Sequence, residues 1–310
     1  MGALCRRDTG SVDDCTGKAQ KNLPQMTTAI GFYSRVRTMN AHATTFLRAA
    51  VLAAALAFAG NTASAGTVWD EIKGSVYGDR KIEDGRGLIF LDAPNRPEDM
   101  RRVPISVGAA FKDGRTVKTV TFIIDENPTP VVAVFHMGGA REQVSLRSEF
   151  RVNAQSDVRA VVEASDGKLY MVSQLVKFAG GQASCSAPPA GDPAEIAANM
   201  GKMSFEPIVA DGAATSIHMG GRIKLSHPNH TGMVMDQITL LYTPIKMVSE
   251  ITVKQGEEQV FTAEGSIALS QDPMIEFDMK RSTSASELEV TMKDTDGGSW
   301  SKKFPVGPAS

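Results

Sequence analysis

The sequence predicts an all-β fold, arranged as two β-sandwich domains joined by a flexible, cysteine-bearing linker and a short helix. Short runs rich in Val, Ile, Phe and Thr recur along the chain, and several of them alternate apolar and polar residues. Turn-forming pairs such as Asn127-Pro128 and Asp166-Gly167 separate these runs. Strands at this spacing, with no helical periodicity between them, are typical of a sandwich.

The first 65 residues are predicted to be an N-terminal extension and a signal peptide that is removed. From Met39, a polar start containing Arg48 leads into an apolar run over residues 49–59 and the small-residue site Ala63-Ser64-Ala65. That run is too short to span a bilayer, which needs about 20 residues, so stable membrane insertion is not expected. We expect cleavage after Ala65 and a periplasmic protein. Residues 1–38 lack hydrophobic periodicity, which makes Met39 a candidate start.

The first predicted domain covers residues 66–179. Its strand patterns follow one another with turn signals such as Lys112-Asp113-Gly114 between them. The predicted strands lie at residues 103–111, 116–125, 131–137, 144–152, 158–165 and 169–178.

The predicted linker, residues 180–201, begins with an arm of Gly, Ala, Ser and Pro. Gly180 and Gly181 open it, and Ser184 and Ser186 flank Cys185. This composition is typical of mobile, solvated chain, so we expect an exposed thiol.

Cys185 is also the only cysteine expected in the exported protein, because Cys5 and Cys15 precede the cleavage site. An odd cysteine in an exported protein is either paired between molecules or used chemically. No Lys, Arg or His lies within several residues of Cys185, so its local sequence offers no charge that would lower the thiol pKa.

The linker ends in a helix signal at residues 191–201, followed by the second predicted domain, residues 202–310. Asp192 is the expected N-cap, Pro193 the first helical residue, Glu195 the partner in a capping box, and Gly201 the stop. Strand patterns then resume at residues 216–227, 237–244, 248–255, 258–265, 274–280, 286–294 and 299–306.

Several longer stretches resemble known families. The segments "DENPTPVVAVF", "VSLRSEFRV" and "VVEASDGKLYMVSQLVKF", followed by glycines and a cysteine, resemble SoxY, the sulfur-carrier subunit of the bacterial thiosulfate-oxidising Sox system. The segments "IKLSHPNHTGM", "VFTAEGSIALSQDPMIEFDMK" and "LEVTMKDTDGGSW" resemble SoxZ, its partner subunit. Their order is that of a natural SoxY–SoxZ fusion, and the chain most resembles the fused SoxYZ-like carriers associated with quinoprotein dehydrogenases.

The resemblance implies immunoglobulin-like sandwiches and a carrier that is not an enzyme. It implies that Cys185 holds sulfur intermediates covalently, with no other cofactor. Gly180, Gly181, Ser184 and Ser186 would form the carrier arm. The implied partners are periplasmic redox enzymes, such as Sox-type cytochromes and hydrolases or a quinoprotein dehydrogenase. Two features depart from SoxY, because three residues separate Gly181 from Cys185 and the chain continues beyond the arm.

Two sets of residues are weaker candidates for binding. Arg147 and Arg151 lie four apart, hence on one face of a strand, and could contact an anionic adduct, although a salt-bridged surface is the commoner role. His218, His227 and His230 lie near methionines and could ligate copper(I), although their spacing matches no established metal motif. The alternative functions are therefore a periplasmic copper-binding or metallochaperone module and a structural adaptor of a quinoprotein dehydrogenase system.

Other classes of protein are disfavoured by composition and motif content. A net charge of -2, with two Trp and four Tyr, gives no basis for nucleic-acid binding. The sequence has no nucleophile elbow, Walker loop, haem-attachment motif or dinucleotide-binding fingerprint.

Overall fold

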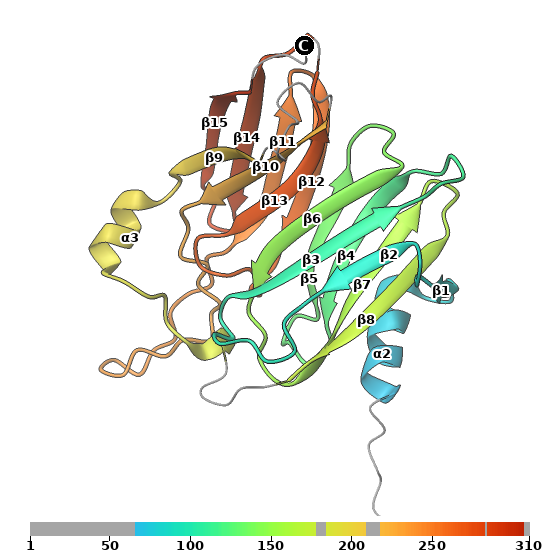
Figure 1. Cartoon of the computed structure of the whole chain (residues 1–310). Coiled ribbons are helices and arrows are strands. Elements are labelled where there is room, and N and C mark those ends of the chain that lie inside the picture. The colour runs from blue at the N-terminus through green and yellow to red at the C-terminus, as the bar shows by residue number, and fades with distance from the viewer. Residues whose placement is uncertain (1–65, 178–183, 209–217, 283, 307–310) are drawn as a thin grey trace, which may run out of the picture. The chain divides into compact units, whose positions relative to one another are not determined.

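The computed structural model describes residues 66–177, 184–208, 218–282 and 284–306. These ranges contain fifteen β-strands, two α-helices and one short 3-10 turn, so the predicted all-β class is confirmed (Figure 1). Neither helix in these ranges has the length and apolar character needed to cross a membrane. The immunoglobulin-like detail and the domain boundaries stay predictions.

The strands form two sheets. The larger has nine strands, in the order β1 (Ile82–Asp84), β8 (Leu169–Val176), β7 (Ser156–Ala164), β4 (Val117–Ile124), β5 (Val131–Met137), β12 (Glu258–Gly265), β11 (Val248–Gln255), β14 (Glu287–Asp294) and β15 (Ser299–Pro305). The smaller has six, in the order β2 (Ile89–Asp92), β3 (Val103–Ala110), β6 (Gln143–Phe150), β13 (Met274–Lys280), β10 (His218–Leu225) and β9 (Met203–Ile208). The β1–β8 pair is parallel, and the other strand pairs are antiparallel.

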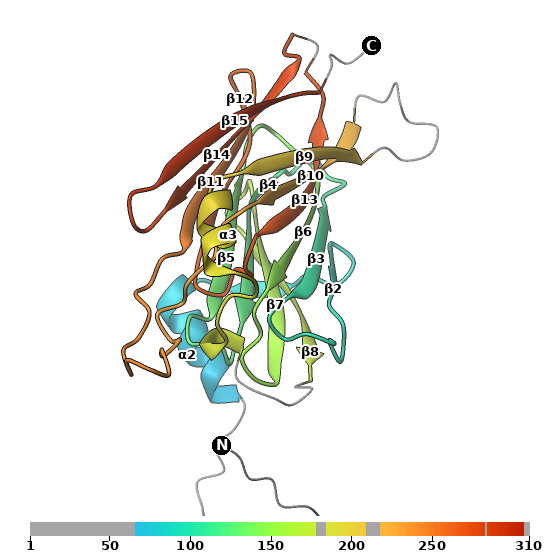
Figure 2. The same cartoon turned by 90° about the vertical axis from the view of Figure 1, so that its left-hand side faces the viewer.

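Both sheets run from the first half of the chain (residues 66–177) into the second half (residues 203–306). In the larger sheet β5 pairs with β12, where Phe135 lies opposite Ala263. In the smaller sheet β6 pairs with β13, where Arg147 lies opposite Glu276. Figures 1 and 2 show the strands of the two halves side by side. In each sheet, a strand of one half pairs with a strand of the other. Without this pairing, each half would leave the backbone N–H and C=O groups of that strand unpaired.

The two halves also share a hydrophobic core. Phe122 and Phe150 of the first half lie 5.2 Å apart between ring centroids, and Phe135 lies 5.5 Å from Phe261 of the second half. Phe261 in turn lies 5.2 Å from Phe277. All of these rings are buried. Packed aromatic pairs contribute beyond the area that they bury, so this row of rings joins the halves in addition to the strand pairing.

The helix α2 (Gly66–Tyr77) was not predicted from the sequence. It buries Ile72 against Ile123, Val161 and Leu169, on the face of the larger sheet that points away from the shared core. The side chains on either side of Ile123 belong to the shared core, because successive residues of a strand point to opposite faces. Here an amphipathic helix covers an apolar patch that an open sheet would expose.

Several predicted elements are confirmed with their bounds. The strands at 131–137, 248–255, 258–265 and 274–280 match the sequence patterns, and the predicted helix is α3 (Pro193–Asn199). The carboxylate of its N-cap, Asp192, accepts hydrogen bonds from the N–H groups of Ala194 and Glu195 at 2.8 and 3.1 Å. The strand predicted at 237–244 is wrong, because this segment forms the tip of a protruding hairpin. The strands β1, β2 and β9 were missed.

We predict that Phe261→Ala destabilises the whole protein. The substitution opens a cavity in the core that joins the two halves, and a buried Phe replaced by Ala typically costs about 3–5 kcal/mol. Equilibrium unfolding in urea, followed by circular dichroism, would show a lower midpoint in one transition. The control is Phe90→Ala, because Phe90 is 67% exposed on β2. An unchanged midpoint for Phe261→Ala would contradict the shared core.

Candidate functional site

Cys185 lies in a short 3-10 turn, Ser184–Ser186, and its side chain is 0% exposed. The sequence-based expectation of an exposed thiol is therefore wrong. The composition of the segment indicates an open loop, but the turn is docked between the two halves of the chain, and specific polar contacts hold it there.

The first half binds the turn through the chain that follows β6. The hydroxyl of Ser184 donates to the carbonyl of Val152 at 2.9 Å, and the N–H of Cys185 donates to Oδ1 of Asn153 at 3.2 Å. The N–H of Asn153 donates in turn to Oδ1 of Asn127, at 2.8 Å. Asn127 is buried, so the acceptor for Cys185 sits on a fixed support.

The second half binds the same turn through Thr231. Its hydroxyl donates to the carbonyl of Cys185 at 2.6 Å and accepts from the N–H of Met233 at 3.1 Å. Thr231 is buried in a tight loop in which Asn229 and Gly232 both have positive φ. The N–H of Cys185 is thus hydrogen-bonded by the first half and its carbonyl by the second. The pocket therefore exists only where the two halves pair.

The positive charge of Arg151 acts on the thiol. Arg151 is 4% exposed, and its Nη1 donates to the carbonyl of Ile267 at 3.1 Å and to the carbonyl of Leu269. Within the described ranges no carboxylate lies within ion-pair distance of Arg151. A buried cation held only by neutral carbonyls is costly, so this pocket favours a negative charge nearby.

Burial and charge act in opposite directions on the thiol. Burial raises the pKa of Cys185, while the positive charge of Arg151 and a hydrogen bond with Ser184 lower it, and burial prevails. In the docked turn the thiol is therefore protonated near neutral pH and is a poor nucleophile. The residues next to Cys185 in the sequence could not indicate the effect of Arg151 on the thiol pKa, because Arg151 lies 34 positions earlier in the chain.

His230 borders the same site and has a buried Nδ1 for which the described residues offer no hydrogen-bond partner. Burial lowers its pKa, and the charges of His227, Arg151 and Lys246 lower it further. His230 is therefore a neutral imidazole near neutral pH.

His227 has a structural role. It is fully buried, with Nδ1 3.0 Å from Oδ1 of Asn229 and Nε2 3.4 Å from Oδ2 of Asp294. Burial lowers the pKa of His227, and these two partners partly offset that effect.

His218 lies on β10, opposite Lys280. In the part of the chain that the structure describes, no three His, Cys, Asp or Glu side chains come together as a metal site.

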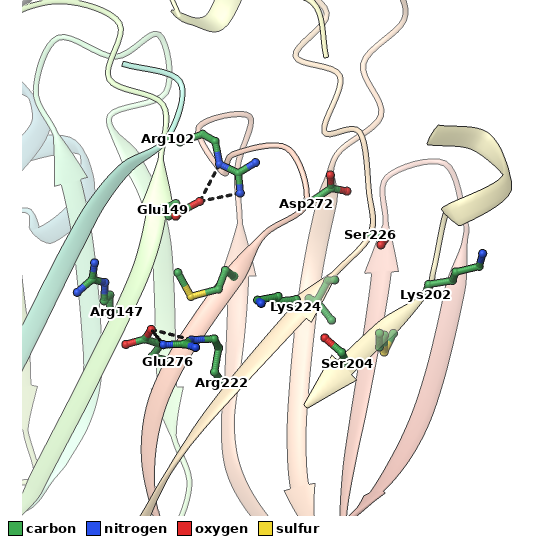
Figure 3. A pocket seen from close by; sticks show the side chains of 13 residues that line it. Arg102, Arg147, Glu149, Lys202, Ser204, Arg222, Lys224, Ser226, Asp272 and Glu276 are labelled. Atoms are coloured by element: carbon green, nitrogen blue, oxygen red, sulfur yellow. Dashed lines mark hydrogen bonds and ion pairs between the residues drawn. The ribbon is translucent and has the colours of Figure 1, made fainter. Parts of the chain in front are cut away.

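The expectation that Arg147 and Arg151 share a strand face is wrong, whereas their role as anion contacts stays a prediction. Arg147 is exposed on β6, whereas Arg151 follows the last residue of β6 and is buried. Arg147 lines a separate polar cleft of about 700 Å³, in which Arg102 pairs with Glu149 and Arg222 with Glu276 (Figure 3). Only Arg151 acts on Cys185.

The predicted arm residues divide into two groups. Gly180 and Gly181 lie outside the described residues. Ser184 is buried beside Cys185, and Ser186 borders a cavity of about 990 Å³ together with His230 and several apolar side chains. Downstream, Ala190 exchanges two hydrogen bonds with the Gln271 side chain, at 2.7 and 2.9 Å. The segment that follows Cys185 is thus also hydrogen-bonded to the second half.

Comparison with known proteins identifies the two halves. The profile of the family "Sulfur oxidation protein SoxY" matches residues 73–182, and that of "Sulphur oxidation protein SoxZ" matches residues 211–305. A search of the curated proteins gave no match.

Among solved structures, the chain is similar to the sulfur carrier protein SoxY from Chlorobium limicola f thiosulfatophilum. The two share 24% identity, the alignment covers 37% of this chain and 99% of that one, and the TM-score is 0.30. It is also similar to a superoxide reductase (neelaredoxin) from Ignicoccus hospitalis, with 10% identity, 35% and 90% coverage, and a TM-score of 0.25. The two family matches, which follow one another along the chain, make this a fused SoxYZ-like protein.

Proposed function

We propose that this protein is a periplasmic carrier, without catalysis of its own, that holds sulfur intermediates covalently on Cys185 and presents them to partner enzymes. One observation carries the proposal. The only thiol expected after export is docked by a SoxY half and a SoxZ half together, beside a buried arginine that has no described carboxylate partner.

The charge around the site supports an anionic cargo. Arg151 borders a small cavity of about 50 Å³ together with Asp99, Arg101, Arg102 and the segment that follows Cys185. Arg101 and Arg102 also lower the pKa of Arg151, after burial and against the charge of Cys185. Arg101 pairs with Asp99 and Arg102 with Glu149, so among the described residues Arg151 is the guanidinium here without a carboxylate partner. It favours a thiolate or an adduct that ends in an oxyanion such as a sulfonate.

Loading needs a redox partner. Joining the thiol to thiosulfate forms a sulfur–sulfur bond and yields a cysteine S-thiosulfonate, one proton and two electrons. The electrons must pass to an acceptor in the partner, and a periplasmic cytochrome is the expected class. A quinoprotein dehydrogenase as partner stays a prediction.

Transfer also requires the turn to leave its pocket. Three hydrogen bonds hold residues 184 and 185, and each contributes about 0.5–1.5 kcal/mol. Undocking is therefore a minor but accessible event, and a partner that binds the undocked turn shifts the population towards it. We infer a cycle in which the thiol is sheltered between encounters and released to its partners.

The first prediction concerns the cargo. Protein purified from its native periplasm should carry added mass on Cys185 that reductant removes, because the cargo is bound through a sulfur–sulfur bond. Intact mass spectrometry with peptide mapping tests this, and Cys185→Ser is the control that should carry none. A bare thiol under conditions that induce the pathway, with a normal phenotype for Cys185→Ser, would overturn the carrier function.

The second prediction concerns docking. Thr231→Val should speed alkylation of Cys185 by roughly two- to tenfold, because the lost hydrogen bond raises the undocked population. The rate with iodoacetamide measures the effect. Thr291→Val is a matched control, since its hydroxyl bonds Ser301 on the far strands β14 and β15. Equal rates for wild type and Thr231→Val would show that this contact does not hold the turn.

The third prediction is a pH dependence. Because burial raises the pKa of docked Cys185, docking favours the protonated thiol and is fully stable below the ordinary cysteine pKa of about 8.5. Protection from alkylation, relative to a free cysteine at the same pH, should be constant below about pH 8 and fall by up to tenfold per pH unit above it. Protection that rises with pH would mean that Arg151 outweighs burial.

A further inference from the structure

A protruding hairpin lies next to the Cys185 site. Its two arms are joined by hydrogen bonds from the N–H of Thr243 to the carbonyl of Val234 at 2.8 Å and from the N–H of Asp236 to the carbonyl of Leu241 at 2.9 Å. The segment projects away from the sheets in Figures 1 and 2, where it is coloured light orange. It contacts neither sheet as a strand, so packing in the core does not explain its sequence.

The tip of the hairpin is ordered by its own hydrogen bonds. One carboxylate oxygen of Asp236 accepts from the N–H groups of Ile238 and Thr239 and from the Thr239 hydroxyl, at 3.0, 2.7 and 2.9 Å. Leu240 has a φ of 57°, an uncommon backbone conformation for a leucine. A tip fixed in this way loses little conformational entropy when it binds.

The tip exposes large apolar side chains. Ile238 is 92% exposed, Leu240 66%, Leu241 70% and Tyr242 64%, and Met235 and Ile245 are partly exposed beside them. Six large side chains exposed side by side present several hundred Å² of apolar surface, which is comparable to the largest apolar patch of a typical monomer, about 300–600 Å². Together with the apolar cavity beside it, this surface is of the order of the roughly 800 Å² that each partner buries in a standard interface.

A concave apolar surface lies on the same side. The cavity of about 990 Å³ that touches Ser186 and His230 is lined largely by apolar residues of the linker, of α3 and of the hairpin, among them Pro189, Ile196 and Val234. Ile238 and Tyr242 of the tip form part of its wall. Leu240 and Leu241 are not part of its lining. The chain thus carries a knob, formed by Leu240 and Leu241, and a cavity that this knob does not fill.

The charges of the hairpin favour protein over lipid. Residues 232–245 contain no Lys or Arg, and their one charge, on Asp236, is engaged in the tip. Segments that bind anionic membrane surfaces carry basic residues beside their apolar ones. A second copy of this chain supplies both a matching knob and a matching cavity, and a twofold axis would bring each knob to the other copy's cavity.

We propose that the protein forms a twofold homodimer in which Leu240 and Leu241, at the hairpin tip of each copy, enter the cavity beside Cys185 of the other. The second copy then covers the wall formed by Ser186 and His230. This interface goes beyond the carrier function and needs no sulfur chemistry at Cys185.

Light scattering during size-exclusion chromatography tests the dimer. The full chain with Cys5, Cys15 and Cys185 replaced by Ser should show twice its single-chain mass at micromolar concentration. Leu241→Asp should weaken dimerisation at least about 100-fold, because each dimer would bury two unpaired carboxylates. Phe90→Asp is the matched control, since Phe90 is equally exposed on β2 and lies outside the cavity lining. Circular dichroism confirms that both variants fold.

Cross-linking tests the geometry. In the same cysteine-free background, Leu241→Cys and Ile196→Cys proteins are mixed and oxidised, and a disulfide should form between the two different variants. A wild-type protein that stays monomeric at about 100 µM overturns the proposal, as does a dimer that Leu241→Asp leaves intact. Binding to phosphatidylcholine vesicles by a monomer would instead assign the hairpin to lipid. None of these results depends on Cys185, so the carrier function is judged separately.

Discussion

The structure depends on the pairing of two seams, β5 with β12 and β6 with β13. Each seam joins strands that lie more than a hundred residues apart, and together they turn two incomplete pairs of sheets into one. The row of phenylalanines from Phe122 to Phe277 fills the space behind them. The Cys185 pocket can form only when these strands are paired, because residues of both halves make up its walls.

Arg151 illustrates this dependence. It follows the last residue of β6, and its guanidinium is held by carbonyls at residues 267 and 269, which lie between β12 and β13. The seam thus brings a cation of the first half within hydrogen-bond distance of backbone carbonyls of the second. The backbone of Cys185 is likewise held by both halves, through Asn153 of the first and Thr231 of the second. A thiol in such a pocket is sheltered by tertiary structure, although its neighbours in sequence are residues of an open loop.

The sequence was informative where the physics is local. Alternating runs such as 131–137 and 258–265 specify strands, and Asp192-Pro193 specifies a helix start, because the signals act within a few residues. The burial of Cys185 was missed because its partners Asn153 and Thr231 lie 32 and 46 positions away. Residues 237–244 have strand-like composition, but Asp236 captures the backbone N–H groups that a strand would need, and the apolar side chains remain in solvent.

Continuity of the two seams within one polypeptide has a consequence for assembly. If the halves were separate chains, the Cys185 pocket would exist only in their complex and would be lost when that complex dissociated on dilution. A covalent connection replaces that bimolecular step with an intramolecular one, at an effective concentration of the order of millimolar for a short flexible connection. The stoichiometry of the two halves is then fixed at synthesis, and no cysteine-bearing half can reach an enzyme without the half that shelters its thiol.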